Sequence, residues 1–448
     1  MFYPEFTQDY IQRALAEPRR FGADAQNMLE TSEETRRLYH GIVIPMTYQG
    51  IFFPEETVHL FEEIIATMVS IGRKITAEYV KNPDYRPGFH FDAKTEDLIL
   101  IDPGYDIPVP VGRYDIFYNG GTDFKFCELN TDGSSAMNED RVLGGLLSET
   151  ELFRAMAEDW DIQPFSLFDT LVSRFLTRYR ALTGRDCQSV AIVDALEKGT
   201  SLEFEVFCDA FRRAGVSAVI ADVRDLTYTG GRLWAPQEDT AERLPIDLVY
   251  RRLVTSDYVA LADAAQPFEQ AYRDRAFLSF GSFRSQVMHA KTIFSMMYDP
   301  RTQAILSDAE NAFVAAHVPW TKDLVSEEDK ARVIAEKDAF ILKPYNSYAS
   351  QGILLGREHE PREWAQIIRD LPLDRYIYQE YVDVDPTPFV ELNPETGALE
   401  ETRLGHVIGL FLYDEAFAGS YTRVGRHGLI SGARPYYSAP AFVVRRKA

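Results

Sequence analysis

Three polar side chains on two neighbouring predicted strands have the chemistry of a magnesium site. Glu128 and Asn130 are two positions apart, so both side chains point to one face of their strand. Asp115 lies on the preceding strand, across a predicted hairpin, and is expected beside them. Two carboxylates and an amide oxygen are hard ligands, and Mg²⁺ is usually held by one or two carboxylates together with substrate phosphates. The alternative is a solvated hairpin face with ordinary acidic residues.

Arg113 is two positions before Asp115 and therefore lies on the same face of that strand. A guanidinium beside a metal site can neutralise the charge of a developing phosphoryl group or tetrahedral oxyanion. We predict this catalytic role for Arg113. The alternative is an ion pair with Asp115.

Two lysines are candidates for binding a polyphosphate. Lys343 ends the apolar strand FILKP and is followed by YNSYASQG, a loop of small residues whose N–H groups can hold phosphate. The Walker A pattern GxxxxGK[ST] is absent. Lys291, in HAKTIF, is the second candidate. The alternatives are a surface lysine before a turn and an exposed helix lysine. The candidate loop residues are Ser347, Ser350, Gln351 and Gly352.

The end of the predicted strand YIYQEYV offers an adenine site. Backbone groups at a strand end can bind an adenine edge while neighbouring apolar side chains sandwich the ring. A plain core strand is the alternative. The candidate residues are Gln379, Glu380, Tyr381 and Val382.

Four segments are expected to position these residues. Residues 1–100 are predicted to be helical, because apolar residues recur at helical spacing from Glu55 to Val80. Residues 101–150 hold the two metal-binding strands, joined by a turn at Asn119-Gly120-Gly121, and a helix is expected from Ser148 to Leu182. Residues 151–285 contain a strand-helix-strand order typical of a parallel α/β unit but no GxGxxG, so no dinucleotide site is predicted there. Residues 286–448 carry the lysines, the loop and the adenine hinge.

Composition excludes several classes of protein. The 448 residues are 46% hydrophobic, which is enough for two or three domains. A net charge of -22 argues against nucleic-acid binding through a basic surface; it is compatible with a cationic substrate, or serves solubility alone. Three cysteines without CxxC spacing indicate a reducing compartment. With no signal peptide and no long apolar run, we expect a cytoplasmic protein that binds no membrane.

Taken together, the motifs resemble the ATP-grasp superfamily in circularly permuted order, and in particular the synthetase domain of glutathionylspermidine synthase. That family has an R-x-D strand, an E-x-N-x-D strand with small hydroxyl residues after it, a helix-starting lysine, a strand ending K-P, a small-residue loop and a hinge containing glutamine. The corresponding residues here are Arg113 to Asp115, Glu128 to Asp132, Ser134, Ser135, Lys291, Lys343-Pro344, Ser347 to Gly352 and Gln379. Arg423 lies where relatives carry a substrate- or phosphate-contacting arginine. The resemblance spans residues 105–448.

This resemblance implies an ATP-grasp fold of the α/β (α+β) class, in permuted order, with a Rossmann-like pre-ATP-grasp domain. It implies an ATP- and Mg²⁺-dependent ligase that joins a carboxylate to an amine through an acyl phosphate. Ser134, Ser135 and Arg423 are the substrate-binding candidates, and Arg251 and Arg252 are either further carboxylate ligands or structural ion-pair residues. The alternative functions are an ATP-dependent phosphotransferase and a non-catalytic nucleotide-binding scaffold.

Three features depart from the family pattern. The usual D-T-P is Asp132-Gly133-Ser134 here, so a different substrate pocket is expected. Residues 1–95 contain no cysteine, so hydrolysis of the amide product is not expected. Glu391-Leu392-Asn393 repeats the E-x-N spelling, but no R-x-D strand closely precedes it, and we predict a hairpin there. The acid and the amine stay open; a small peptide, an amino acid or a polyamine would each be compatible.

Overall fold

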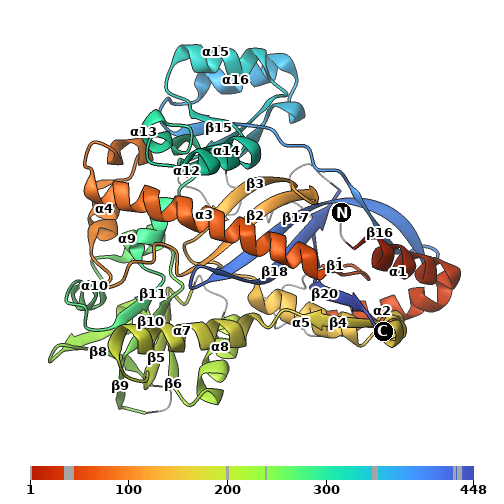
Figure 1. The fold of residues 1–448 in the computed structure, drawn as a ribbon, viewed down its shortest axis with the longest axis horizontal. Coiled ribbons are helices and arrows are strands. Elements are labelled where there is room, and N and C mark those ends of the chain that lie inside the picture. The colour runs from red at the N-terminus through yellow and green to blue at the C-terminus, as the bar shows by residue number, and fades with distance from the viewer. Residues whose placement is uncertain are drawn as a thin grey trace.

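An antiparallel sheet lies at the centre of the protein, in the order β19-β18-β17-β2-β3, with β16 also paired to β17 (Figure 1). The computed structural model describes residues 3–34, 45–197, 201–237, 240–345, 352–426, 430 and 436–447. The strands of the central sheet are β2 (Val111–Gly120), β3 (Asp123–Asn130), β16 (Thr387–Asn393), β17 (Ala398–Tyr413), β18 (Ala416–Gly425) and β19 (Tyr437–Ala439). Two strands near residue 120 therefore complete a sheet whose other strands come from the end of the chain.

The hairpin of β2 and β3 forms where the turn residues predicted it. Gly120 and Gly121 both have positive φ, 114° and 54°, which glycine adopts without the steric cost of a Cβ. The second E-x-N segment, Glu391 to Asn393, lies in the hairpin of β16 and β17, as expected.

Helices of the N-terminal region cover the central sheet. The predicted helix from Glu55 is α3 (Glu55–Lys81), which crosses in front of the sheet in Figure 1. Its Phe61 ring lies 5.5 Å from that of Tyr118 on β2 and 5.8 Å from that of Phe417 on β18. The other helices of the region are α1 (Pro4–Ala16), α2 (Pro18–Glu34) and α4 (Ala93–Leu100). Burial of this apolar face, rather than helix propensity, holds α3 in place.

A three-stranded sheet joins distant parts of the chain. β20 (Ala441–Arg446) lies between β1 (Ile51–Phe53) and β4 (Trp160–Pro164). The single helix expected from Ser148 to Leu182 is wrong, because β4 interrupts it between α6 (Glu151–Asp159) and α7 (Leu167–Thr183). Residues 160–164 extend because β20 supplies their antiparallel partner.

The predicted α/β unit is present as a parallel sheet in the order β11-β10-β5-β6. Its strands are β5 (Ser189–Asp194), β6 (Ser217–Asp222), β10 (Leu248–Arg251) and β11 (Leu278–Phe280). α7 and α8 (Ser201–Arg213) pack on this sheet. A small antiparallel sheet extends from it, formed by β7 (Thr227–Thr229), β8 (Arg232–Pro236) and β9 (Arg243–Pro245).

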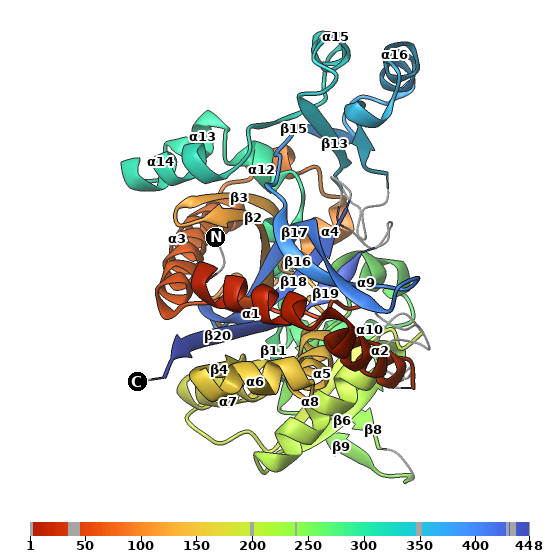
Figure 2. The same ribbon diagram turned by 90° about the vertical axis from the view of Figure 1, so that its right-hand side faces the viewer.

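A separate lobe stands on the opposite side of the central sheet from the α/β unit (Figure 2). The sheet of this lobe has the order β12-β15-β13-β14. The lobe has a small hydrophobic core of its own, in which Trp364 is fully buried. Its elements are β12 (Thr321–Asp323), α15 (Glu327–Ala335), β13 (Phe340–Pro344), β14 (Leu354–Leu355), α16 (Pro361–Asp370) and β15 (Tyr376–Glu380). The segment before this lobe contains α11 (Gln286–His289), α12 (Ile293–Met296), α13 (Pro300–Gln303) and α14 (Asp308–His317).

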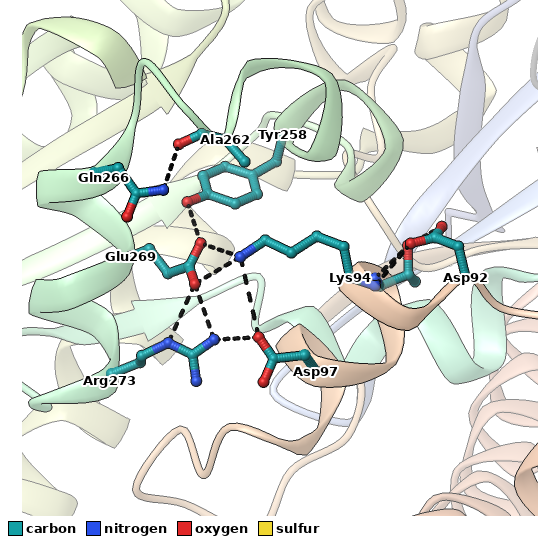
Figure 3. A network of polar contacts seen from close by, with 9 residues as sticks. Asp92, Lys94, Asp97, Tyr258, Ala262, Gln266, Glu269 and Arg273 are labelled. Carbon is teal, nitrogen blue, oxygen red and sulfur yellow. Dashed lines mark hydrogen bonds and ion pairs between the residues drawn. The ribbon is translucent and has the colours of Figure 1, made fainter.

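A polar network fixes α4 on the α/β unit, where α9 (Thr255–Leu261) and α10 (Gln266–Arg273) lie (Figure 3). Lys94 donates to both carboxylate oxygens of Glu269 at 2.7 Å, and Arg273 and Tyr258 donate to the same carboxylate. Arg273 also pairs with Asp97. Burial raises the pKa of Glu269, but hydrogen bonds from Lys94, Arg273 and Tyr258 bring it below its ordinary value. The network ties the N-terminal region to the α/β unit.

No helix in the described part of the chain combines the length and apolar character needed to cross a membrane.

Candidate functional site

β2 and β3 bring four of the predicted side chains together. Asp115 is directly opposite Glu128, and Arg113 is opposite Asn130. On its other edge β2 pairs with β17, where Gly409 is opposite Asp115. A Cβ at position 409 would lie 2.5 Å from Cδ of Arg113 and 2.9 Å from Oδ1 of Asp115. Glycine is required there, and sequence reasoning missed it because the partner strands are far apart in the chain.

Two arginines share the carboxylate of Asp115, which has no exposed surface. Arg113 donates from Nε to Oδ1 at 2.6 Å and from Nη2 to Oδ2 at 3.0 Å. Arg423, on β18, donates from Nη2 to Oδ2 at 2.8 Å. Burial lowers the pKa of Arg113, but the charge of Asp115 and its hydrogen bonds raise it above its ordinary value overall. The ion pair that was the alternative for Arg113 is thus present, and it holds the guanidinium at the site.

Glu128 and Asn130 complete this group. The amide nitrogen of Asn130 donates to Asp115 at 3.1 Å and to Glu128 at 3.0 Å. Burial raises the pKa of Glu128, but the charges of Lys291 and Arg423 and the bond from Asn130 bring it far below its ordinary value. Glu128 is therefore ionised at neutral pH.

This donor set fits a magnesium ion chemically. Two carboxylates lie side by side, and turning the amide of Asn130 would present an oxygen beside them. Arg423 already places a cationic nitrogen between Asp115 and Glu128, 3.8 Å from Oε1 of the latter. Within the described ranges, no three His, Cys, Asp or Glu side chains form a cluster suited to a metal ion. A divalent ion here would therefore depend on amide and phosphate oxygens in addition to the carboxylates.

A small pocket lies beside the carboxylates and contains both predicted lysines. Burial lowers the pKa of Lys291, and the charge of Glu128 opposes this. Burial likewise lowers the pKa of His289, whose Nδ1 has no hydrogen-bond partner among the described residues. His289 was not predicted, although it lies two positions before Lys291. The pocket is lined by Cys127, Glu128, Leu129, Asn130, His289, Lys291, Phe294 and Lys343.

Lys343 on β13 is oriented by two acceptors. Its ammonium donates to the carbonyl of Cys127 at 3.0 Å and to Oε1 of Gln379 at 2.8 Å. Gln379, on β15, donates in turn to Oγ1 of Thr321 at 2.9 Å and is only 2% exposed. The Gln379 side chain, predicted for the adenine hinge, therefore supports the candidate phosphate lysine Lys343.

The rest of the predicted hinge lies at the end of β15. The N–H groups of Glu380 and Tyr381 donate to the carbonyls of Trp320 and Ala339. Val382 follows beyond the end of the strand. Arg357 lies over the Tyr381 ring, 4.1 Å from its centroid. The predicted adenine contacts at Glu380, Tyr381 and Val382 thus fall on a segment with two of its backbone donors already engaged.

Most of the predicted phosphate loop, Ser347, Ser350 and Gln351, lies outside the described residues. Gly352 is described: its φ is +72°, and a Cβ there would lie 2.9 Å from Cγ of Pro344. Both features favour glycine where the chain passes back over the end of β13.

The two predicted serines follow β3. Ser134 is buried and its hydroxyl donates to the carbonyl of Asn130. The carbonyl of Ser135 accepts from Nη1 of Arg113 at 2.9 Å. Both serines therefore lie at the site, and Ser135 contributes its backbone to the support of Arg113.

The two arginines at the end of β10 differ in their contacts. Arg251 is fully paired: it donates to Asp132 and to the carbonyls of Gly281, Leu253 and Ser282. Arg252 donates from Nη2 to Glu203 at 2.7 Å, but its Nε and Nη1 are buried without a hydrogen-bond partner among the described residues. Arg251 thus forms the structural ion pair that was the alternative to carboxylate binding. Arg252 retains two N–H donors that a ligand would satisfy.

Asp132 and Gly133 explain the departure from D-T-P. The Asp132 carboxylate holds Arg251 and accepts from the N–H of Thr255 at 2.6 Å, at the start of α9. Gly133 has φ +67°, and a Cβ there would lie 2.6 Å from the carbonyl oxygen of Arg252. The segment after β3 is therefore docked against the end of β10.

Comparison with known proteins gives a likeness in structure alone. No family model matches the chain, and no curated protein matches it. The solved structure of a glutathione synthetase-like effector from Globodera pallida, in its apo form, is similar with a TM-score of 0.59 and 10% identity, and covers 95% of this chain and 97% of that one. The solved structure of the ATP-grasp ligase PsnB, complexed with minimal precursor, is 15% identical over 56% of this chain and 89% of that one, with a TM-score of only 0.27. The chain therefore has the fold of the glutathione synthetase-like effector.

Proposed function

We propose that this protein is an ATP- and Mg²⁺-dependent ligase that joins a carboxylate to an amine through an acyl phosphate, on an ATP-grasp fold in permuted order. The observation that carries the proposal is the arrangement on one sheet face. Asp115 and Glu128 lie opposite each other, with Arg423 between them. Lys291 and Lys343 line the adjacent pocket. The carboxylate strands β2 and β3 precede the lysine strand β13 and the hinge strand β15, which supports the permuted order.

The reaction needs no nucleophile from the protein. A carboxylate oxygen of the acid attacks the γ-phosphorus of ATP, and ADP leaves. The amine then attacks the acyl carbon, loses a proton, and inorganic phosphate leaves. Lys291 and Lys343 hold the phosphates, and Arg113 stabilises the charge that spreads in each step. Asp115, Glu128 and Asn130 would hold Mg²⁺, which would neutralise charge on the phosphate oxygens.

The acid substrate is placed by guanidinium groups and small polar residues. Arg423 faces the site from β18, and Ser134 and Ser135 follow β3. Arg252 has two buried donors left over at the carboxyl end of the parallel sheet, the edge at which ligands bind in open α/β sheets. Arginine forks suit carboxylates because they bind both oxygens.

A nucleotide-binding measurement tests the proposal. ATP analogue with Mg²⁺ is expected to raise the melting temperature of the wild-type protein by roughly 2 °C or more at saturating ligand, because it binds only the folded state. Glu128→Gln is expected to lose this shift. Glu391→Gln is the matched control. Glu391 is also the first residue of an E-x-N sequence, but it lies on β16 and forms an ion pair with Arg426. Wild-type protein without any shift at millimolar nucleotide would contradict the proposal.

Phosphate release then separates the ligase from the phosphotransferase. A ligase releases phosphate fully only when both an acid and an amine are present. A phosphotransferase releases ADP with an alcohol alone and forms a stable phosphate ester. Screening acid–amine pairs against single substrates distinguishes the two.

A further inference from the structure

Arg423 occupies the space between the two carboxylates of the candidate metal site. Its Nη2 lies 2.8 Å from Oδ2 of Asp115 and 3.8 Å from Oε1 of Glu128. The amide nitrogen of Asn130 spans the same two carboxylates at 3.1 and 3.0 Å. N–H groups of Arg423 and Asn130 therefore lie between the two carboxylates, where a divalent ion would bind.

Cationic side chains gather around the two carboxylates. Arg113 and Arg423 contact Asp115, and Lys291 and Lys343 line the pocket beside Glu128. A free divalent cation entering this group meets net repulsion, whereas a polyphosphate brings several negative charges that complement it. The charge balance therefore favours a metal ion that arrives with a polyphosphate over a metal ion alone.

Release of Arg423 requires only a change of its side chain. Its backbone is held on both sides, since Arg423 is paired with Val407 on β17 and with Ser438 on β19. Oδ2 of Asp115 accepts from three donors, so the departure of Arg423 opens one acceptor position while Arg113 still holds the carboxylate. The freed guanidinium would remain within reach of the site and able to bind an anion.

We propose that the guanidinium of Arg423 occupies the metal position between Asp115 and Glu128 until a divalent ion bound to polyphosphate displaces it. The displaced side chain of Arg423 then binds the anionic substrate. The inference rests on the proposed function, because it takes the nucleotide and its metal as the ligands. Contact of Arg423 with Asp115 and binding of the metal ion therefore exclude each other, and Arg423 acts as a positioning residue. By linkage, removal of Arg423 tightens metal binding.

Binding of Mn²⁺ to the full chain, followed by electron paramagnetic resonance, tests this. Wild-type protein is expected to bind Mn²⁺ weakly alone and much more tightly with ADP. Arg423→Gln is expected to bind Mn²⁺ alone about tenfold more tightly than wild type, within the range of measured coupling between sites. Adding Glu128→Gln to this variant is expected to abolish the gain. Arg426→Gln is the control: it removes the same charge three positions on, where the side chain is half exposed and pairs with Glu391.

Two results would overturn the inference. One is Mn²⁺ binding by Arg423→Gln that is no tighter than in wild type; the other is tight, Glu128-dependent binding of Mn²⁺ alone by wild type. The second result needs only the wild type and Glu128→Gln, so the inference stays open to disproof even if Arg423→Gln does not fold. Wild-type protein that binds neither ADP nor Mn²⁺ with ADP would instead contradict the proposed function.

Discussion

The ammonium of Lys343 lies 2.8 Å from the amide oxygen of Gln379, so the candidate phosphate lysine and the candidate hinge residue are joined directly. Gln379 is held from behind by Thr321. The three residues lie on the adjacent strands β13, β15 and β12 of the lobe, and the lysine reaches from there to the carbonyl of Cys127 on the central sheet. Any change in the position of the lobe therefore moves the lysine relative to the carboxylates.

Gln379→Met is expected to weaken nucleotide binding about tenfold, because Lys343 loses one of its two anchors and the Thr321 hydroxyl loses its donor. The measurement is nucleotide titration of the wild type and the variant. Gln366→Met is the control, since that exposed glutamine donates hydrogen bonds to exposed Asp370 on α16. Unchanged affinity in Gln379→Met would show that the Cys127 carbonyl alone orients the lysine.

Gly409→Ala is expected to lower the free energy of unfolding by about 1–3 kcal/mol and to impair nucleotide binding, because the added methyl group overlaps Arg113 and Asp115. Chemical denaturation and nucleotide titration measure the two effects. Gly145→Ala, in the helix α5 (Met137–Ser148), is the matched control: no atom lies within 4 Å of its added Cβ, and alanine stabilises a helix. Equal behaviour of the two variants would contradict the close approach at Gly409.

Asp140→Asn is expected to stabilise the protein at neutral pH and not at pH 4. Burial raises the pKa of Asp140 to about 8. The folded-state pKa thus lies above the unfolded one, so the contribution of this group to stability is full below pH 4 and is lost as pH rises to 8. Asparagine has no such loss, and the gain at pH 7 should exceed about 1 kcal/mol. Urea denaturation from pH 4 to 8 measures it, with exposed Asp209→Asn as the control.

Asp132→Asn is expected to destabilise the protein by about 3–5 kcal/mol, because Arg251 would remain buried and charged without its partner. The double variant Asp132→Asn with Arg251→Met removes both charges, so it should lose less stability than the sum of the two single variants. A double-mutant cycle in denaturant measures the coupling. Additive effects would show that the pair does not hold the end of β3 to β10.

Local patterns predicted those features that depend on neighbouring residues. The hairpin of β2 and β3, with Asp115 beside Glu128, follows from strand alternation and the turn at Asn119. The α/β unit and α3 follow from apolar spacing. Each of these is decided within a few tens of residues.

Features that depend on distant partners were missed. The segment 160–164 forms a strand only because β20 pairs with it, and its own sequence continues a helical pattern. Gly409 was missed because its role depends on the approach of Arg113 and Asp115 on β2. His289 was missed because its neighbours Glu128 and Leu129 lie on β3. The position of Arg423 came from the resemblance to a family, since nothing near it in the sequence indicates that it meets Asp115.

The place of β20 between β1 and β4 has a consequence for biosynthesis. Neither of its partners can complete the three-stranded sheet until residues 441–446 have left the ribosome, and β2 waits in the same way for β17. The edges of β1, β4 and β2 that these late strands will cover stay open during translation, when exposed strand edges are prone to pair wrongly. Nascent chains stalled before β20 should therefore depend on chaperones, and the synthesis of β20, rather than that of the N-terminal region itself, should set the moment at which the N-terminal helices dock.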